Sequence, residues 1–174
     1  MPLSGHIWVE GLNLHYIDET GGTEYLIKFE GESKTFMSNA FVCPAPGTDW
    51  TPKVEGAGLA ASLSAKKMWL PLNWLKIGDG IVSYKLVGDV VEVAAATLDC
   101  KLVRVNKADP LTTTDIAGGG ITQVTADGNF DVEAVLSAVE TVATDKQYVL
   151  EITGTTGVGD SISVIGAEVL VKRV

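Results

Sequence analysis

Apolar and polar residues alternate one by one along most of this chain, and a period of two is typical of β-strands. Val82, Tyr84 and Leu86 share one side of segment 81–87, and Tyr148 and Leu150 repeat the pattern further on. Beyond residue 59 the alternation predicts about eight strands, at 68–72, 81–87, 90–95, 97–105, 121–126, 130–137, 148–152 and 162–171.

Turn residues separate these segments at intervals of roughly 8 to 15 residues, which is the spacing of an all-β sandwich. No alternation of strands with helical segments is visible, and this disfavours a parallel doubly wound sheet. Segment 130–137 is expected to be a strand, with a short helix as the alternative because Val132, Leu136 and Val139 fit helical spacing. The sequence therefore predicts an all-β protein, with an antiparallel β-sandwich of jelly-roll type at residues 59–174.

The alternation changes phase at two places, and such a change inside a strand indicates a β-bulge. The apolar positions move from Leu102 to Val103 in segment 97–105, and they move again at Ile165 and Gly166. Glycine-rich pieces predict turns at 88–89 and 118–120 and a hairpin connection at 154–160. The last piece lacks the lysine and the following helix of a phosphate-binding loop.

Residues 1–43 predict a smaller N-terminal β-meander, or arm, with short strands at 6–9, 13–17 and 24–30. Three short strands bury little apolar surface, so we expect the meander to depend on the rest of the chain or on a neighbouring molecule. Three prolines and three glycines between residues 44 and 58 predict a linker or a long surface loop. The expected domains are thus 1–43, the linker 44–58, and 59–174.

The composition supports this interpretation and excludes some functions. Hydrophobic residues form 46% of the 174 residues, and 21 valines and 16 threonines suit a pleated sheet. No run approaches the roughly 18 apolar residues of a membrane span, so we expect the apolar surplus in a core and in a subunit interface. A net charge of −9 without a long basic cluster disfavours nucleic-acid binding. The start of the sequence has no signal-peptide pattern, and Cys43 and Cys100 are expected to be two buried thiols, with one disulfide as the alternative.

Few residues point to catalysis. The two histidines, His6 and His15, both lie in the small meander, which is a poor platform for a positioned base. The segment from Asp127 to Asp131 resembles the start of a calcium loop, but Val132 and Ala138 replace the glycine and glutamate of an EF-hand. At most an irregular Ca²⁺ site is expected there. We therefore expect no enzyme activity, no catalytic residues, no cofactor and no defined metal site.

Two stretches resemble jelly-roll proteins encoded among the virion genes of tailed phages. They are 69–88, which begins Trp-Leu-Pro-Leu-Asn-Trp, and 148–169, which begins Tyr-Val-Leu-Glu-Ile-Thr-Gly. The opening segment 5–18 is also similar to short meanders at the start of phage structural proteins. The resemblance covers residues 59–174 and implies a capsid decoration, or cement, protein on the virion surface. Such a protein, made in the host cytoplasm, would form a homo-oligomer, a trimer by expectation, and would bind the major capsid protein to reinforce the shell.

Aromatic side chains supply the candidate partner contacts, which are Trp8, Tyr16, Tyr25, Trp69 and Trp74, with core packing as the alternative for the last two. Tryptophan and tyrosine are favoured at interfaces because each combines a large apolar surface with a polar tip. The same tryptophans favour an alternative function, a phage fibre, spike or receptor-binding component. In that alternative, tryptophan rings and the 112–120 loop would contact carbohydrate.

Overall fold

A computed structural model describes the backbone of residues 5–10, 13–18, 24–28, 31–37, 40–43, 49–54 and 56–173, and the side chains of those from residue 40 onward. Every regular element in this part of the chain is a β-strand, so the all-β expectation is confirmed. No helix among the described residues is long and apolar enough to cross a membrane. The chain divides into two compact units, Met1–Gly31 and Glu32–Val174.

The first unit contains the expected meander. Strands β1 (Gly5–Glu10), β2 (Asn13–Asp18) and β3 (Glu24–Lys28) form an antiparallel sheet in the order β1-β2-β3. In this sheet Trp8 lies opposite His15, and Tyr16 lies opposite Tyr25. The alternation of residues 6–28 therefore predicted both the strands and their order.

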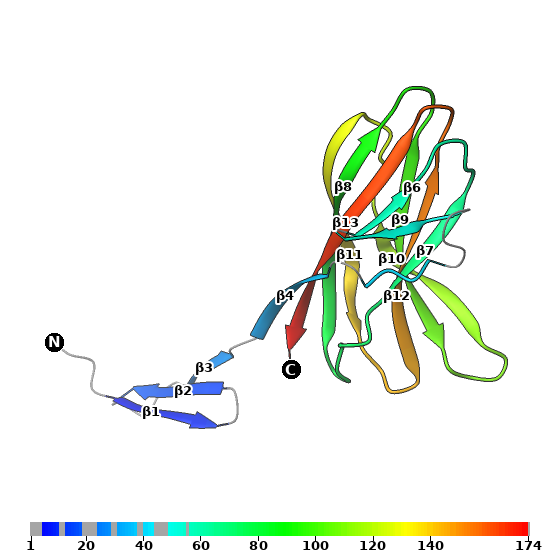
Figure 1. Cartoon of the computed structure of the whole chain (residues 1–174). Coiled ribbons are helices and arrows are strands. Elements are labelled where there is room, and N and C mark those ends of the chain that lie inside the picture. Colours follow the sequence, from blue (N-terminus) through cyan, green and yellow to red (C-terminus); the bar gives the residue numbers. More distant parts are fainter. Residues whose placement is uncertain are drawn as a thin grey trace. The chain divides into compact units, whose positions relative to one another are not determined.

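The second unit is the β-sandwich drawn in Figure 1. One sheet has the order β10-β9-β12-β7, and the other has the order β11-β8-β13-β6-β5. The eight strands from β6 onward are β6 (Gly56–Leu59), β7 (Lys66–Pro71), β8 (Gly80–Val91), β9 (Thr97–Asn106), β10 (Thr112–Gly120), β11 (Gly128–Thr141), β12 (Lys146–Thr155) and β13 (Ser161–Arg173).

The pairing of these eight strands is that of a jelly roll. The first pairs with the last, β6 with β13, and the same nesting continues inward with β7–β12, β8–β11 and β9–β10. A long antiparallel hairpin wrapped in this way produces two four-stranded sheets that face each other. The predicted jelly-roll sandwich is therefore confirmed.

Two further strands extend the β13 sheet. Strand β4 (Gly31–Met37) pairs with β13, and β5 (Thr51–Lys53) pairs with β6. Strand β5 and most of β6 thus lie within the range 44–58 that the sequence assigns to a linker or loop. Trp50, in the same range, is completely buried and donates a hydrogen bond from Nε1 to the Lys66 carbonyl at 2.9 Å. Burial of this large indole ties the segment to the sandwich.

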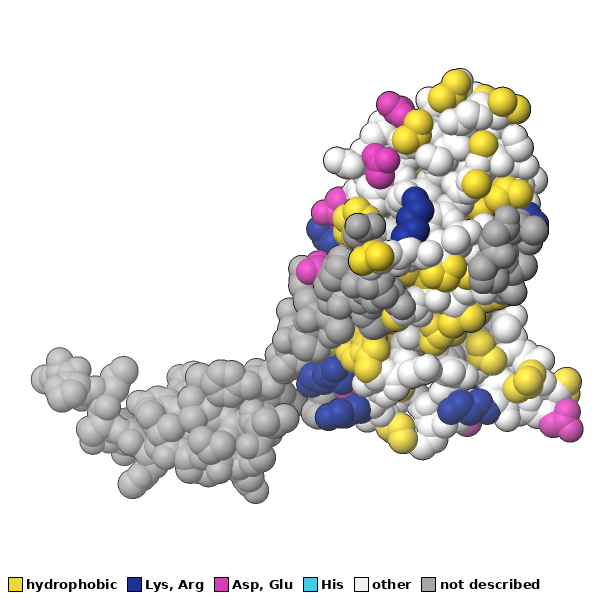
Figure 2. All heavy atoms as spheres, viewed as in Figure 1, with side chains coloured by type: hydrophobic (Ala, Val, Ile, Leu, Met, Phe, Trp, Pro, Cys, Tyr) yellow, Lys and Arg dark blue, Asp and Glu magenta, His cyan; other side chains and the backbone are white. Residues whose placement is uncertain are grey.

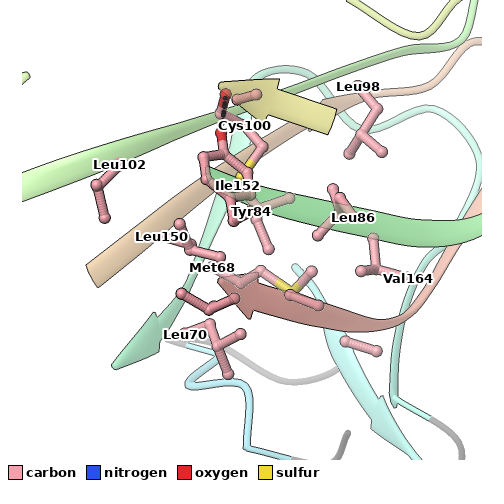
Figure 3. Packing of buried hydrophobic residues seen from close by; sticks show 14 of the residues in the cluster. Met68, Leu70, Tyr84, Leu86, Leu98, Cys100, Leu102, Leu150, Ile152 and Val164 are labelled. Atoms are coloured by element: carbon pink, nitrogen blue, oxygen red, sulfur yellow. Dashed lines mark hydrogen bonds between the residues drawn. The ribbon is translucent and has the colours of Figure 1, made fainter. Parts of the chain in front are cut away.

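The core lies between the two sheets. Figure 3 shows side chains of both sheets pointing toward one another, among them Met68, Leu86, Leu102, Leu150 and Ile152, all with no exposed surface. These are the inward positions of the alternating segments. The pattern of period two therefore identified the core correctly.

Tyr84 links the sheets at the centre of the core. Its hydroxyl donates toward the carbonyl oxygens of Cys100, at 2.9 Å, and Gly119, at 2.8 Å, across the sandwich (Figure 3). Only 1% of this residue is exposed. A buried hydroxyl needs such a partner, because leaving a polar group unpaired in a core costs free energy.

The predicted turn at 88–89 is wrong, because β8 runs through both residues without interruption. Gly88 lies opposite Phe130 of β11 on one side and Val164 of β13 on the other. A Cβ atom at Gly88 would lie 2.2 Å from the Ser163 carbonyl oxygen and 2.4 Å from Cζ of Phe130. Glycine is required here for close approach inside a strand rather than for a turn.

One of the two predicted bulges is confirmed. The register of β13 against β8 shifts between Val164 and Gly166, so Ile165 is the extra residue. The bulge predicted at Leu102 and Val103 is wrong, and the irregularity lies in the neighbouring strand β10 instead. β9 pairs with β12 in continuous register through Val103, whereas β10 shifts against β9 between Asp115 and Gly120. The predicted turn at 118–120 is therefore wrong, because these glycines belong to the irregular part of β10.

Segment 130–137 is a strand, as predicted, within the longer β11, and the alternative helix is wrong. The expected hairpin at 154–160 is also wrong, because β12 and β13 belong to different sheets and their connection crosses between them. Asp160 in this connection is 1% exposed. Its carboxylate accepts backbone N–H hydrogen bonds at 2.6–3.0 Å from Val93, Ala94, Ala95 and Gly157.

Asp160 thereby joins the β12–β13 connection to the β8–β9 connection at one end of the sandwich. Val93 and Val158 are 71% and 79% exposed there. Figure 2 shows apolar side chains at this upper end of the sandwich. Backbone hydrogen bonds to the charged form lower the pKa of Asp160 to about 2, the bond from Val93 contributing most.

Candidate functional site

Several polar side chains converge on the outer surface of the β10-β9-β12-β7 sheet. The inward positions of these strands are apolar, so the alternate positions point outward. In register, Trp69 of β7 lies opposite Glu151 of β12, and Glu151 lies opposite Lys101 of β9. We call this surface the Glu151 face, and define it as Lys67, Trp69, Asp99, Lys101, Asp115, Gln123, Glu151 and Thr153.

Glu151 is the centre of the face because three side chains donate to it. Lys67 Nζ lies 3.0 Å from Oε1, and Lys101 Nζ lies 3.4 Å from the same oxygen. Trp69 Nε1 donates to Oε2 at 3.3 Å. Burial opposes the charge on Glu151, but the hydrogen bonds from Lys67 and Trp69 outweigh burial and lower the pKa of this carboxyl. Glu151 is therefore a fixed, ionised acceptor at neutral pH.

Lys101 extends the network toward β10. Its Nζ lies 3.0 Å from Oδ2 of Asp115, and this hydrogen bond is the main reason why the pKa of Lys101 is raised. On the other side of the face, Gln123 Nε2 donates to Asp99 Oδ2 at 2.8 Å. The face thus presents ammonium and amide donors beside carboxylate acceptors, in positions set by adjacent strands of one sheet and the loop that holds Gln123.

A shallow hollow of about 360 Å³ lies in this surface and is open to solvent. It is lined by Lys67, Asp99, Cys100, Lys101, Gly120, Ile121, Glu151 and Thr153. Ordinary ligand sites have a similar volume but are usually more enclosed. The hollow can therefore hold part of an extended ligand lying on the sheet, with hydrogen bonds from side chains along its length.

The structure separates the two tryptophans that the sequence considered together. Trp69 is half-buried on the Glu151 face. Trp74 follows β7, packs partly buried against the core, and has Arg173 5.2 Å above its ring. Nε1 of Trp74 is buried and has no hydrogen-bond partner among the residues that the structure describes. Of these two candidate contacts, Trp69 alone belongs to the polar surface.

Three other candidate contacts lie in the meander. Trp8, Tyr16 and Tyr25 have their backbones in β1, β2 and β3, and their side chains lie outside the described residues. The 112–120 segment, expected as a glycan-contacting loop, is the edge strand β10 of the sheet that also carries Trp69. The structure thus brings Trp69 and this segment into one sheet, at its opposite edges.

Sequence reasoning missed Lys67, Lys101 and Glu151. Each occupies an outward position of an alternating strand, which is the signal that could have selected them. That signal alone does not show that they meet, because Trp69 and Glu151 are 82 positions apart and only the strand order joins them.

The carboxylates near the expected irregular calcium site have other partners. Asp127 Oδ1 accepts a hydrogen bond from the Glu92 backbone N–H at 2.9 Å, and Asp131 pairs with Lys85 at 3.5 Å. Within the described ranges, no group of three or more His, Cys, Asp or Glu side chains is placed to hold a metal ion. Cys43 and Cys100 are both free thiols.

No protein-family model matches the sequence, and no curated protein matches it either. Among solved structures, the chain is similar to the CBM36-1 domain, a carbohydrate-binding module, of a multidomain xylanase from the hindgut metagenome of Trinervitermes trinervoides. The identity is 12% and the TM-score 0.41, over 79% of this chain and 96% of that one.

It is also similar to the CBM22-1–GH10 modules of endo-1,4-β-D-xylanase 10B from Clostridium thermocellum, a structure complexed with xylohexaose. Here the identity is 15% and the TM-score 0.41, over 84% of this chain and 27% of that one. The jelly-roll assignment rests on the strand pairing within this chain.

Proposed function

We propose that this protein binds carbohydrate on the Glu151 face and carries out no chemical step there. The main support is the half-buried Trp69 beside a fixed carboxylate and two ammonium groups on an open sheet surface. A sugar ring has apolar C–H faces, which pack on an indole, and hydroxyls, which both donate and accept hydrogen bonds. A surface that combines these elements fits a sugar better than it fits a purely apolar partner.

The rigidity of the face also supports the proposal. Lys67, Lys101 and Trp69 hold Glu151 in one position before any ligand arrives. A binding site that is already ordered loses less conformational entropy when its ligand binds. This matters for an open surface, because the contact area available to each sugar ring is small.

A glycan array, followed by titration of the hits with tryptophan fluorescence, tests this function. Trp69→Ala should weaken binding of a hit by about tenfold, since a stacked ring contributes on the order of 1.4 kcal/mol. Trp69→Phe should retain most of the binding but lose most of the fluorescence change.

Trp74→Phe is the matched control, because it replaces a tryptophan away from the face and keeps an aromatic ring beneath Arg173. It should bind as the unmodified protein does. An array without hits, together with unchanged fluorescence on titration, would reject carbohydrate binding.

A structural role in a tailed-phage particle is a second proposal, and a different observation supports it. Strands β1, β2 and β3 form a three-stranded sheet in a unit of their own. Three short strands are marginally stable in water, so this unit is suited to contact with another molecule. Light scattering should then give the mass of a trimer, and mixing with empty capsid shells should give saturable binding. A monomeric mass, together with no binding to empty shells, would reject this role.

A further inference from the structure

We infer that the Glu151 face selects uncharged glycans, and that Lys67 and Lys101 serve to hold Glu151 rather than to bind acidic sugars. This inference rests on the proposed carbohydrate binding and specifies the class of ligand. Two lysines in a sugar-binding hollow would ordinarily suggest a uronic acid, because ammonium groups attract carboxylates. The distances on this face argue for the opposite specificity.

Both lysines already have carboxylate partners. Lys67 lies 3.0 Å from Glu151, and Lys101 lies between Asp115 at 3.0 Å and Glu151 at 3.4 Å. With Asp99 included, two lysines meet three carboxylates, so the face carries one negative charge in excess. A sugar carboxylate would have to displace one of these pairs and approach the remaining acids. Like charges brought together on binding are unfavourable.

A neutral sugar meets no such penalty. The ammonium groups keep their ion pairs and still have N–H donors free for hydroxyl oxygens, since each lysine has three donors. Carboxylate oxygens likewise accept more than one hydrogen bond. The paired charges of the face therefore act as a set of donors and acceptors with little net charge, which is a match for hydroxyl groups.

The strand order gives the direction and length of the ligand. From Trp69 on β7 to Asp115 on β10, the face crosses β12 and β9. Neighbouring strands lie about 4.8 Å apart, so the row spans about 14 Å. A single sugar ring covers only part of that row. We therefore expect affinity to rise with chain length until the oligosaccharide crosses all four strands.

Calorimetric titration of the full chain with oligosaccharides of matched length tests the inference. Neutral chains built from glucose, xylose or mannose are compared with chains of galacturonate and guluronate, at low ionic strength where charge effects are largest. Binding of a neutral chain about tenfold or more tighter than any acidic chain is the expected result. Tighter binding of an acidic chain would overturn the inference and leave carbohydrate binding intact. Absence of all binding would reject both.

A charge exchange on the face gives a second, independent readout. The double variant Asp115→Asn, Glu151→Gln removes two carboxylates and releases both lysines. It should lose affinity for the neutral chain and gain about tenfold for the acidic chain, a gain that added salt abolishes.

The matched control is Asp131→Asn, Glu133→Gln, which also removes two carboxylate charges, but from β11 in the other sheet. It should leave both affinities unchanged. An equal gain in the control would show that net charge rather than the Glu151 face governs selection, and would overturn the inference.

Discussion

Removal of one hydroxyl group from the core tests how the two sheets are held together. Tyr84→Phe deletes the group that donates toward the carbonyls of Cys100 and Gly119 at 2.9 and 2.8 Å. The Cys100 carbonyl keeps its hydrogen bond from the Ile121 N–H at 3.0 Å, so the Gly119 carbonyl bears the larger loss. A lost buried hydrogen bond with a poorly satisfied carbonyl costs about 2 kcal/mol. For a chain of this size, the melting temperature should fall by about 4–8 °C.

Urea denaturation followed by circular dichroism measures this loss directly. Burial raises the pKa of Tyr84, so the phenol resists ionisation in the folded protein. Its stabilising contribution is complete below the unfolded pKa of about 10 and is lost as pH rises above that value. The unmodified protein should therefore lose stability above pH 10 more steeply than Tyr84→Phe. Tyr148→Phe is the comparison, because the hydrogen bond from its hydroxyl to Glu140 is only part-buried, so water can partly replace it and the loss should be smaller. Equal urea midpoints for Tyr84→Phe and the unmodified protein would refute this reasoning.

Three further predictions concern the sandwich. The pKa of Asp160 is lowered to about 2, so its contribution to folding stability is present above about pH 4 and is lost as pH falls toward 2. Asp160→Asn should therefore be less stable at pH 7, and its melting temperature should lose this acid dependence. Gly88→Ala places a Cβ against the Ser163 carbonyl and should cost about 2 kcal/mol in urea denaturation, a value that a mere turn glycine would not give. Burial raises the pKa of Cys100 to about 12, so this thiol should react with Ellman's reagent only as fast as the protein unfolds. Rapid reaction of the folded Cys43→Ser variant, in which Cys100 is the remaining thiol, would contradict this.

Most strands and the core could be predicted because both depend on local alternation. The predicted strand at 121–126 is wrong, since only Val124 makes an isolated bridge there, and β10 was expected as a loop. Tyr84, Leu86 and Leu150 were placed on inward faces by the pattern alone, and all three are buried. The bulge at Ile165 was also predictable, since a phase change beside a glycine is typical of an extra residue in a strand. These features are encoded within ten or so neighbouring residues.

Features that depend on distant neighbours were not predicted. A glycine at position 88 is compatible with a turn and with close packing, and the ring of Phe130 decides between them. The Glu151 face has the same origin, because β7, β12 and β9 become neighbours only through the nested pairing of the jelly roll. Trp69 was selected for its type, whereas its polar partners required the register.

The position of β13 has a consequence for synthesis of the protein. This strand lies inside its sheet, where it pairs with β8, β6 and β4. While a nascent chain emerges from the ribosome, β8 lacks one of its two neighbours until residues 161–173 appear. Pairings between residues so far apart in sequence also form slowly. The unpaired edge of β8 and its apolar inward side chains should therefore stay exposed until β13 has emerged. Ribosome-bound chains stalled before Ser161 should bind chaperones and be cleaved by protease, whereas chains in which a linker carries residue 173 clear of the ribosome should resist cleavage.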